Sequence, residues 1–431
     1  MRIISILLLL MVSVLFGQED ALVMDLSGWV QLAFENSPDI DRSSADLLSA
    51  DAAVSSSSSF LWPSLTFSSS AGHSWSSTPD MGGGYTDTDN SSWSLSGRLS
   101  QEILASGGRN WLLLSGSRHS REASRYDHDQ VRLELTMDVI VAYYGVIESI
   151  GLYSTSEKAL DRTNEQMRRI QSLYDLGAAT NLELIQTEVQ QSRDSLTLLQ
   201  RRQAVSNAYA LLYQTAGLVG SHTKVNTHAV LQPVSRNSAM NFSADLSRNN
   251  SLAAARERLT EVQLSYEAYK RSYWPSLNAS GNWNWSNDEL EFDDFTDRDS
   301  WSISLTMSWT LFDGFSRESG IQSSRASVLR QQASYESLNN SLTTAVLTSR
   351  NDLISSIETW QLSLEILNQA EEQLRLSEMS YDLGSLPLLD LLDALSGVSD
   401  AEASVESAIT SSLIAEARLL VLLGQVPRIG E

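Results

Sequence analysis

The 431-residue chain contains no cysteine and is poor in basic side chains. Without cysteine it has no disulfides, thiolate metal sites, cysteine nucleophiles or lipidated N-terminal cysteine. Lys and Arg number 30 against 53 Asp and Glu, a formal net charge of -23. Binding a nucleic-acid backbone requires excess positive charge, so we expect no nucleic-acid partner. Because the chain cannot form disulfides, we expect its fold to be stabilised by packing alone.

Long hydrophobic runs are also scarce. The longest, Ile3 to Phe16, follows Arg2 and precedes Gly17. It is too short for a comfortable transmembrane helix and is typical of a secretory signal peptide, which we place at residues 1–17. No later stretch approaches ~18 apolar residues, so a mature chain that enters a membrane is expected to do so as β-barrel strands.

Catalytic and metal-binding motifs are not found. There is no G-x-S-x-G, no H-E-x-x-H and no phosphate loop, and the serine-rich run at 55–59 is not a nucleophile elbow. The histidines show no metal-ligand spacing; they are His73, His119, His128, His222 and His228. We therefore expect no enzyme activity, no cofactor and no metal site.

Three landmarks occur twice, in the same order. Trp62-Pro-Ser-Leu65 recurs at Trp274, Trp93-Ser-Leu-Ser at Trp301 as Trp-Ser-Ile-Ser, and Tyr174-Asp-Leu-Gly177 at Tyr381. The spacings between copies are 212, 208 and 207 residues, which indicates an internal duplication. We expect a first repeat at 18–217, a linking segment at 218–243 and a second repeat at 244–431.

Each repeat is expected to contain a helix, two strands, a long helix and a returning helix. Apolar residues on the long helices are spaced 4, 3, 4, 3, as in a coiled-coil seam; they are Leu133, Met137, Ile140, Tyr144 and Ile147, then Leu353, Ile357, Trp360, Leu364 and Leu367. The second long helix, at 316–381, would extend roughly 100 Å. The helices at 244–272 and 388–423 are about half as long, which favours a wall of paired antiparallel helices.

The strand segments alternate between apolar and polar residues. The apolar series is Leu277, Ala279, Gly281, Trp283 and Trp285, then Trp301, Ile303, Leu305, Met307, Trp309 and Leu311. This pattern, with Trp at the ends, suits a barrel that faces lipid outside and water inside, although a half-buried soluble hairpin alternates identically. The first repeat is less regular, because Ser69 and His73 fall on its apolar face. Four strands cannot enclose a water-filled lumen, so we expect a cyclic oligomer.

From Leu26 to about Gly424 the sequence resembles the TolC-like outer-membrane factor family. The resemblance is carried by several short motifs in order: Asn36-Ser-Pro38, the two Pro-Ser-Leu segments, Trp309-Thr-Leu-Phe-Asp-Gly314, and Tyr381-Asp-Leu-Gly384 leading into Leu388-Leu-Asp-Leu-Leu-Asp-Ala394. It implies a mainly α fold with a membrane β-barrel, in which a homotrimer builds a twelve-stranded barrel in outer-membrane lipid. Long antiparallel coiled-coil helices would continue the barrel as a tunnel into the periplasm.

The resemblance also implies a function. Such a duct would be the passive outer-membrane channel of a tripartite efflux pump or a type I secretion system. It would dock onto a periplasmic adaptor and an inner-membrane transporter of RND, ABC or MFS type, and export small molecules or proteins. The residues alone leave a second hypothesis, a periplasmic coiled-coil scaffold without a membrane barrel.

Asp390 and Asp393 lie three residues apart at the start of the returning helix and so share a face. The resemblance implies that three copies of this pair form a periplasmic gate, a ring of carboxylates that favours cations and is blocked by multivalent ones. The alternative is a pair of acids that the helix dipole stabilises in its first turn. In the first repeat, Glu183 and Gln186 occupy the corresponding positions.

The helix-hairpin tips are marked by Tyr174 and Gly177 in the first repeat and by Tyr381 and Gly384 in the second. We expect both glycines to end their helices in the left-handed conformation. The tyrosines either bond between neighbouring coiled coils or are buried with a satisfied hydroxyl.

One position departs from the family pattern. Well-studied members carry a basic residue two positions after the second glycine, where it latches the tip shut, but here that position is Leu386. The acidic segment Asp288 to Asp299, which links the third and fourth expected strands, suggests either a Ca²⁺-binding loop or a solvated one, and it lacks the spacing of a known calcium loop.

Overall fold

The computed structural model describes residues 23–218, 223–226, 233–240, 242, 245–288 and 299–427. The expected signal peptide, residues 289–298 of the acidic segment, His222 and His228 lie outside this part of the chain.

The chain divides into two compact units. The first, here called the helical unit, comprises Met1–Ser44, Asp127–Ser251 and Asn339–Glu431. The second, the strand unit, comprises Ala45–Tyr126 and Leu252–Leu338. Each unit therefore takes segments from both expected repeats.

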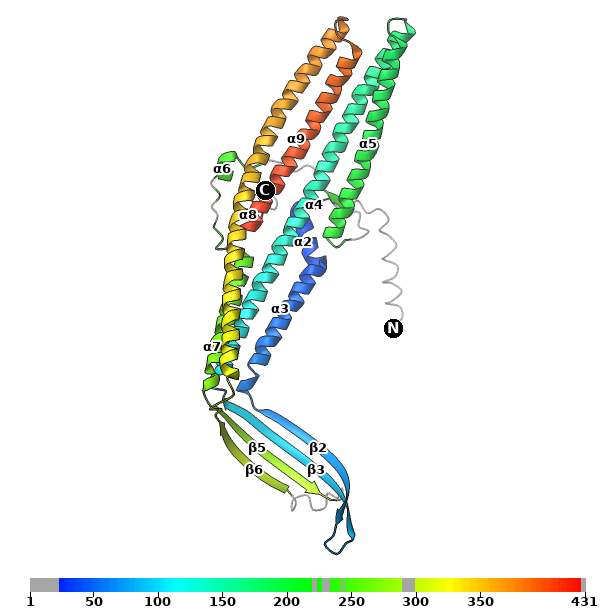
Figure 1. The fold of residues 1–431 in the computed structure, drawn as a ribbon. Helices are drawn as coiled ribbons and strands as arrows, with labels where there is room; N and C mark the ends of the chain where they lie inside the picture. The colour runs from blue at the N-terminus through cyan, green and yellow to red at the C-terminus, as the bar shows by residue number, and fades with distance from the viewer. Residues whose placement is uncertain are drawn as a thin grey trace, which may run out of the picture. The chain divides into compact units, whose positions relative to one another are not determined.

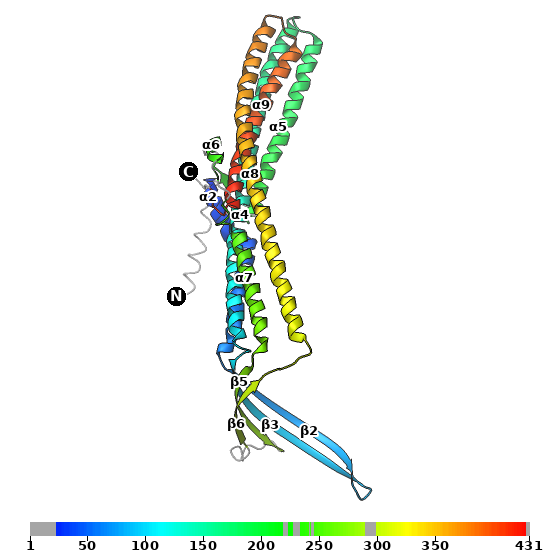
Figure 2. The ribbon, with the colours of Figure 1, turned by 60° about the vertical axis from the view of Figure 1, so that its left-hand side comes forward.

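The strand unit contains one antiparallel sheet with the order β2-β3-β5-β6, visible in Figures 1 and 2. Its strands are β2 (Ser64–Pro79), β3 (Tyr85–Leu104), β5 (Ser276–Asn287) and β6 (Asp299–Ser308). Short 3-10 turns, η2 (Ser59–Leu61) and η3 (Arg271–Tyr273), precede the Trp-Pro dipeptides that open β2 and β5. Proline disfavours a helical conformation in the residue before it, which explains why the helices end there.

Strand β6 is shorter than the alternation predicted, since it ends at Ser308 and not at Leu311. Residues 309–311 lead instead into a tight turn in which Gly314 and Phe315 have φ of +66° and +69°. The Trp309 indole N–H donates to the Tyr273 carbonyl at 3.0 Å, so this side chain bonds to the 3-10 turn that precedes β5.

The helices are mostly long. They are α2 (Leu26–Asn36), α3 (Pro38–Ser57), α4 (Arg109–Asp175), α5 (Asn181–Thr215), α6 (Arg236–Met240), α7 (Asn250–Lys270), α8 (Ser316–Asp382) and α9 (Leu388–Leu422). Within the helical unit α4 turns back as α5 and α8 turns back as α9, forming two antiparallel hairpins (Figure 1). The ten seam residues expected on α4 and α8 are all buried or half-buried.

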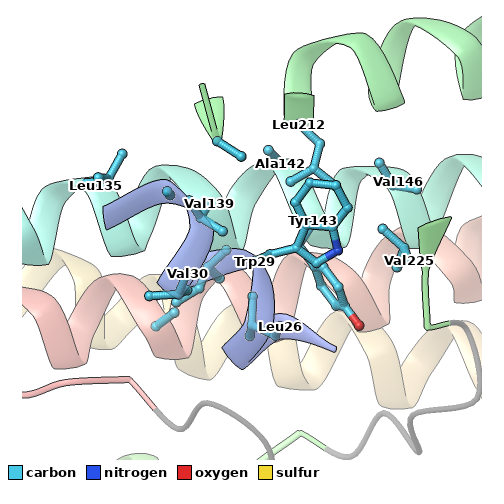
Figure 3. Packing of buried hydrophobic residues seen from close by; sticks show 14 residues of the cluster. Leu26, Trp29, Val30, Leu135, Val139, Ala142, Tyr143, Val146, Leu212 and Val225 are labelled. Atoms are coloured by element: carbon cyan, nitrogen blue, oxygen red, sulfur yellow. The ribbon is translucent and has the colours of Figure 1, made fainter. Parts of the chain in front are cut away.

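The main core of the helical unit surrounds Trp29 of α2, which is fully buried (Figure 3). Val139, Tyr143 and Val146 of α4 pack in the same cluster. Two short parallel strands, β1 (Val23–Met24) and β4 (Lys224–Val225), border this core. The Tyr143 hydroxyl donates to the Asn226 carbonyl at 3.1 Å, and burial raises the pKa of Tyr143 to about 12.

Among the described helices, α4 alone has an 18-residue window that is long and apolar enough to cross a membrane, and 44% of that window is buried. This window is not the run of about 18 apolar residues that was expected to be absent, because polar side chains interrupt α4 throughout. Its apolar residues, such as Val139 and Val146, are buried in the core around Trp29. Packing in a helical core is sufficient to account for them.

Candidate functional site

The sheet of the strand unit exposes a broad apolar face. On β6 the exposed fractions of Trp301, Ile303, Leu305 and Met307 are 77%, 94%, 67% and 63%. Leu65 and Phe67 of β2 are exposed as well. A contiguous apolar face of this kind is rare on a soluble monomer and marks contact with lipid or with another chain.

The opposite face of the same sheet carries hydroxyl and amide groups. Serine pairs hydrogen-bond across neighbouring strands, with oxygen to oxygen distances of 2.8 Å for Ser68 and Ser96 and 2.9 Å for Ser280 and Ser304. Between β3 and β5, the Arg98 guanidinium donates to the Asn282 side-chain oxygen at 2.8 Å. This face is suited to contact with water.

Exposed tryptophans mark both ends of the strands. Trp62 and Trp274 lie where the chain enters the sheet from the helices, and Trp75 and Trp301 lie towards the other end. From Leu65 to Trp75 the strand extends about 33 Å at 3.3 Å per residue. A tilt of about 45°, usual for barrel strands, would reduce this to roughly 23 Å, close to the apolar band of outer-membrane barrels.

The two helix-hairpin tips have the same backbone geometry. Gly177 and Gly384 have φ of +75° and +71°, so both adopt the left-handed conformation. Their N–H groups donate to the carbonyls of Tyr174 and Tyr381, each at 2.9 Å. These bonds end α4 and α8 in the way expected of helix C-terminal glycines.

Residues of both hairpins near their tips form an apolar cluster, here called the tip cluster. It contains Ile170 of α4 and the buried face of α9, with partly buried side chains around it; its members are Ile170, Leu388, Leu391, Leu392 and Leu395, with Leu173, Leu184, Leu374, Tyr381 and Leu386 at its border. Leu386, which replaces the basic latch residue, therefore packs against this cluster.

Asp390 and Asp393 lie on the opposite side of α9 from the tip cluster, and both are exposed. Pro387 is the N-cap of α9 and makes no side-chain cap bond. Within the described part of the chain neither carboxylate has a hydrogen-bond or ion-pair partner. Both charges are thus available at the start of α9, where the helix dipole stabilises them.

Glu183, the first-repeat counterpart of Asp390, has a different environment. Thr180 and Glu183 form a capping box at the start of α5. The Glu183 carboxylate accepts the Thr180 backbone N–H at 2.6 Å, and the Glu183 N–H donates to the Thr180 hydroxyl at 3.3 Å. The Thr-x-x-Glu spacing is a known sequence signal for this cap and would have identified it in advance.

Sequence reasoning also missed an ion pair that joins the two hairpins. Arg169 of α4 donates to the Asp382 carboxylate at the end of α8. The same guanidinium lies 5.5 Å from the centre of the Tyr381 ring, a cation–π distance. Burial and the nearby charge of Glu183 raise the pKa of Tyr381. No short motif signals a contact between residues 213 positions apart.

A second polar contact joins the hairpins further along. Arg162 of α4 donates to Glu402 of α9 at 3.0 Å and to the Ser399 hydroxyl at 2.9 Å. Within the helical unit, α4 is therefore joined to α8 at Asp382 and to α9 at Glu402.

In the residues that the structure describes, no group of three or more His, Asp or Glu side chains is arranged to hold a metal ion. The described histidines each contact one neighbouring polar group or two: His119 lies 2.6 Å from Glu257, His128 2.8 Å from the Ser43 hydroxyl, and His73 3.0 Å from Asp89 and 3.1 Å from Ser91.

Residues 29–218 and 242–425 match the family model described as outer membrane efflux protein. No curated protein matches the chain in sequence. Among solved structures, the Campylobacter jejuni CmeC outer membrane channel is 16% identical with a TM-score of 0.80, covering 94% of this chain and 87% of that one. The Vibrio cholerae outer membrane protein VceC is 17% identical with a TM-score of 0.79, covering 94% and 97%. The open state of the Neisseria gonorrhoeae MtrE outer membrane channel is 16% identical with a TM-score of 0.76, covering 94% and 91%.

Proposed function

We propose that this chain, which belongs to the outer membrane efflux protein family, is the exit duct of a tripartite efflux pump or a type I secretion system. It conducts small molecules or proteins passively from an inner-membrane transporter to the exterior.

Family membership settles the broader questions. The chain is a TolC-like outer-membrane channel protein that extends into the periplasm, and it is not an enzyme. The proposal concerns its assembly, its gate and the system that it serves.

The observation that carries the proposal is the two-faced sheet with its open ends. One face is apolar and exposed, the other is lined with hydroxyl groups, and among the described residues β2 and β6 each pair with one strand only. In lipid such edges must be paired, because bare backbone N–H and C=O groups cost several kcal/mol each, on the order of 2–7. Three chains with four strands each give a closed twelve-stranded barrel whose polar face lines a water-filled lumen.

The helical hairpins are proposed to form the periplasmic tunnel and its gate. Asp390 and Asp393 supply two carboxylates per chain to a ring at the periplasmic mouth. The hairpin tips at Tyr174, Gly177, Tyr381 and Gly384 surround that mouth. The partners are a periplasmic adaptor protein and an inner-membrane transporter of RND, ABC or MFS type.

The proposal is tested by fractionation followed by conductance measurements. The protein should resist extraction from outer membranes by salt and carbonate and should form trimers in detergent. In planar bilayers these trimers should open ion-conducting pores. Release by carbonate washing would exclude the channel and favour a periplasmic scaffold. Crosslinking in cells followed by purification would identify the adaptor and the transporter.

A further inference from the structure

We infer that β6 of one chain pairs antiparallel with β2 of a second copy in one fixed register, with Trp301 opposite Trp75 of the partner subunit and Thr306 opposite Ser70 of the partner subunit. The inference rests on the proposed trimeric barrel and adds the residues at which its subunits join.

The two edge strands are the only places where a closed barrel can be completed from this sheet. In the described part of the chain, β2 pairs with β3 alone and β6 with β5 alone. Strands in this sheet alternate in direction, so β6 and the β2 of a neighbouring copy meet antiparallel. Because three identical chains close a ring, every joint between chains is the same joint.

The two hairpins of the chain have equivalent registers. In the first, Ser64 pairs with Ser100, and in the second Ser276 pairs with Ser308. Ser276 lies 212 residues after Ser64, and Ser308 lies 208 residues after Ser100, which are the spacings that relate the two sequence repeats. The pairings of Ala71 with Trp93 and of Trp283 with Trp301 agree as well. Strand β5 is thus the structural equivalent of β2, and β6 is the equivalent of β3.

The joint between β3 and β5 then serves as a template for the joint between chains. It connects the second strand of one repeat to the first strand of the next. The joint between β6 and a neighbouring β2 makes the same connection. Arg98 pairs with Asn282 in the template, and Trp93 pairs with Asn287. Applying the same spacings places Thr306 opposite the partner's Ser70, and Trp301 opposite the partner's Trp75.

The side chains on the apolar face fit this register. Within the chain, some large residues on this face lie opposite small ones, as in the pairs of Ile303 with Gly281 and of Trp283 with Gly97, and others form bulky pairs, as Trp283 does with Trp301. In the proposed joint, Leu305 lies opposite the partner's Ala71 and Met307 opposite the partner's Ser69. The serine that interrupts the apolar pattern of β2 therefore faces a bulky neighbour.

The polar face fits equally well. Thr306 lies opposite the partner's Ser70, and Ser302 lies opposite the partner's Ser74. These hydroxyl pairs continue the ladder formed within the chain by Ser68 and Ser96. A slip by two residues in one direction sets Met307 against the partner's Phe67, and a slip in the other direction sets Ile303 against the partner's Trp75. Each slip sets one such bulky pair opposite each other and separates Trp301 from the partner's Trp75.

The absence of native cysteine permits a direct test by disulfide crosslinking. Ser70→Cys is combined in turn with Ser304→Cys, Thr306→Cys and Ser308→Cys. Directly opposite residues have Cβ atoms about 4.5–5.5 Å apart and diagonal ones about 7–8 Å. A disulfide needs Cβ atoms about 3.5–4.5 Å apart, so a short bifunctional thiol reagent is used beside the oxidant. Within one chain these residues are separated by two intervening strands, roughly 14 Å, so every crosslink joins two chains.

We expect the Ser70 and Thr306 pair to give at least about fivefold more covalent trimer on non-reducing gels than either alternative pair. The positive control, Ser68→Cys with Ser96→Cys, should crosslink within one chain. A maximum at Ser304 or Ser308 would overturn the register and leave the barrel intact. Absence of all three crosslinks in a protein that still resists carbonate extraction would overturn the inference alone. Absence of crosslinks together with carbonate release would instead refute the proposed function.

Discussion

The two helix-hairpin tips have the same backbone conformation, but their acidic side chains differ in hydrogen bonding. In the turn after α4, Ala178 N–H donates to the Leu173 carbonyl at 2.8 Å, and in the turn after α8, Ser385 N–H donates to the Ser380 carbonyl at 3.0 Å. After the first turn Thr180 caps the next helix together with Glu183, whereas after the second turn the cap residue is Pro387.

This difference shows what a helix cap does to a nearby charge. The Glu183 carboxylate accepts from the Thr180 N–H and hydroxyl, so the cap occupies it. Proline has no side-chain acceptor, and its cap leaves Asp390 unengaged. The second tip therefore lacks about 1 kcal/mol of capping stabilisation, and its Asp390 carboxylate remains exposed and able to bind a cation.

The largest predicted difference between the tips concerns their packing. Leu391 is 1% exposed in the tip cluster, whereas its first-repeat counterpart Leu184 is only partly buried there. We expect Leu391→Ala to lower the local opening free energy by about 3 kcal/mol and Leu184→Ala by about 1 kcal/mol, because cavity formation costs most where burial is complete. Hydrogen exchange of tip amides measures both values. Equal losses would show that the two tips are packed alike.

The second prediction concerns the charges. Asp390→Asn with Asp393→Asn should weaken block of single-channel current by divalent or trivalent cations at least about tenfold, because the double change removes both carboxylates that each chain contributes to the proposed ring. The matched control is Glu183→Gln, which removes a carboxylate already engaged in a cap and should leave the block nearly unchanged. Equal effects of the two changes would refute the assignment of the gate to the second tip.

Much of this fold was predictable because its signals are periodic. The spacing of apolar residues predicted α8 at 316–381, and the structure places it at Ser316–Asp382. The returning helix α9, expected at 388–423, occupies Leu388–Leu422. Period-two alternation located β5 and β6, but it carried β6 three residues too far, because alternation does not report which residues find a bonding partner.

The details of the tips were less predictable. The Thr180 and Glu183 cap follows a local motif and was open to prediction. The Arg169 and Asp382 pair depends on how α4 packs beside α8, and no local pattern encodes that. The sequence showed that Leu386 stands where well-studied family members carry a basic residue, but only the packing shows that its side chain lies against the tip cluster.

A third prediction tests the cap itself. Thr180→Ala should reduce protection of the first turn of α5 by about 1 kcal/mol, whereas Thr180→Ser keeps a hydroxyl acceptor and should change it little. Hydrogen exchange of residues 181–184 measures the effect. If Thr180→Ala also strengthened multivalent cation block, the released Glu183 would be acting as a gate acid, and the contrast between the two tips would depend on the cap alone. Unchanged protection would show that the cap contributes nothing.

The smallest predicted effect concerns the ion pair between the hairpins. Arg169 and Asp382 are 43% and 54% exposed, so their interaction should contribute at most about 1 kcal/mol, a factor of about five in an equilibrium. We expect Arg169→Ala and Asp382→Ala each to raise the open fraction of single channels by up to about fivefold, and the double variant to add little. In the first tip, the one hydrogen-bond donor to the Asp175 side chain among the described residues is Gln171 of its own helix, so Gln171→Ala should leave opening unchanged. Additive effects of the two single changes would show that the pair does not couple the hairpins. An effect of Gln171→Ala equal to that of Arg169→Ala would show that loosening either tip is sufficient.

High salt should diminish the effect of Arg169→Ala, because exposed charges are screened.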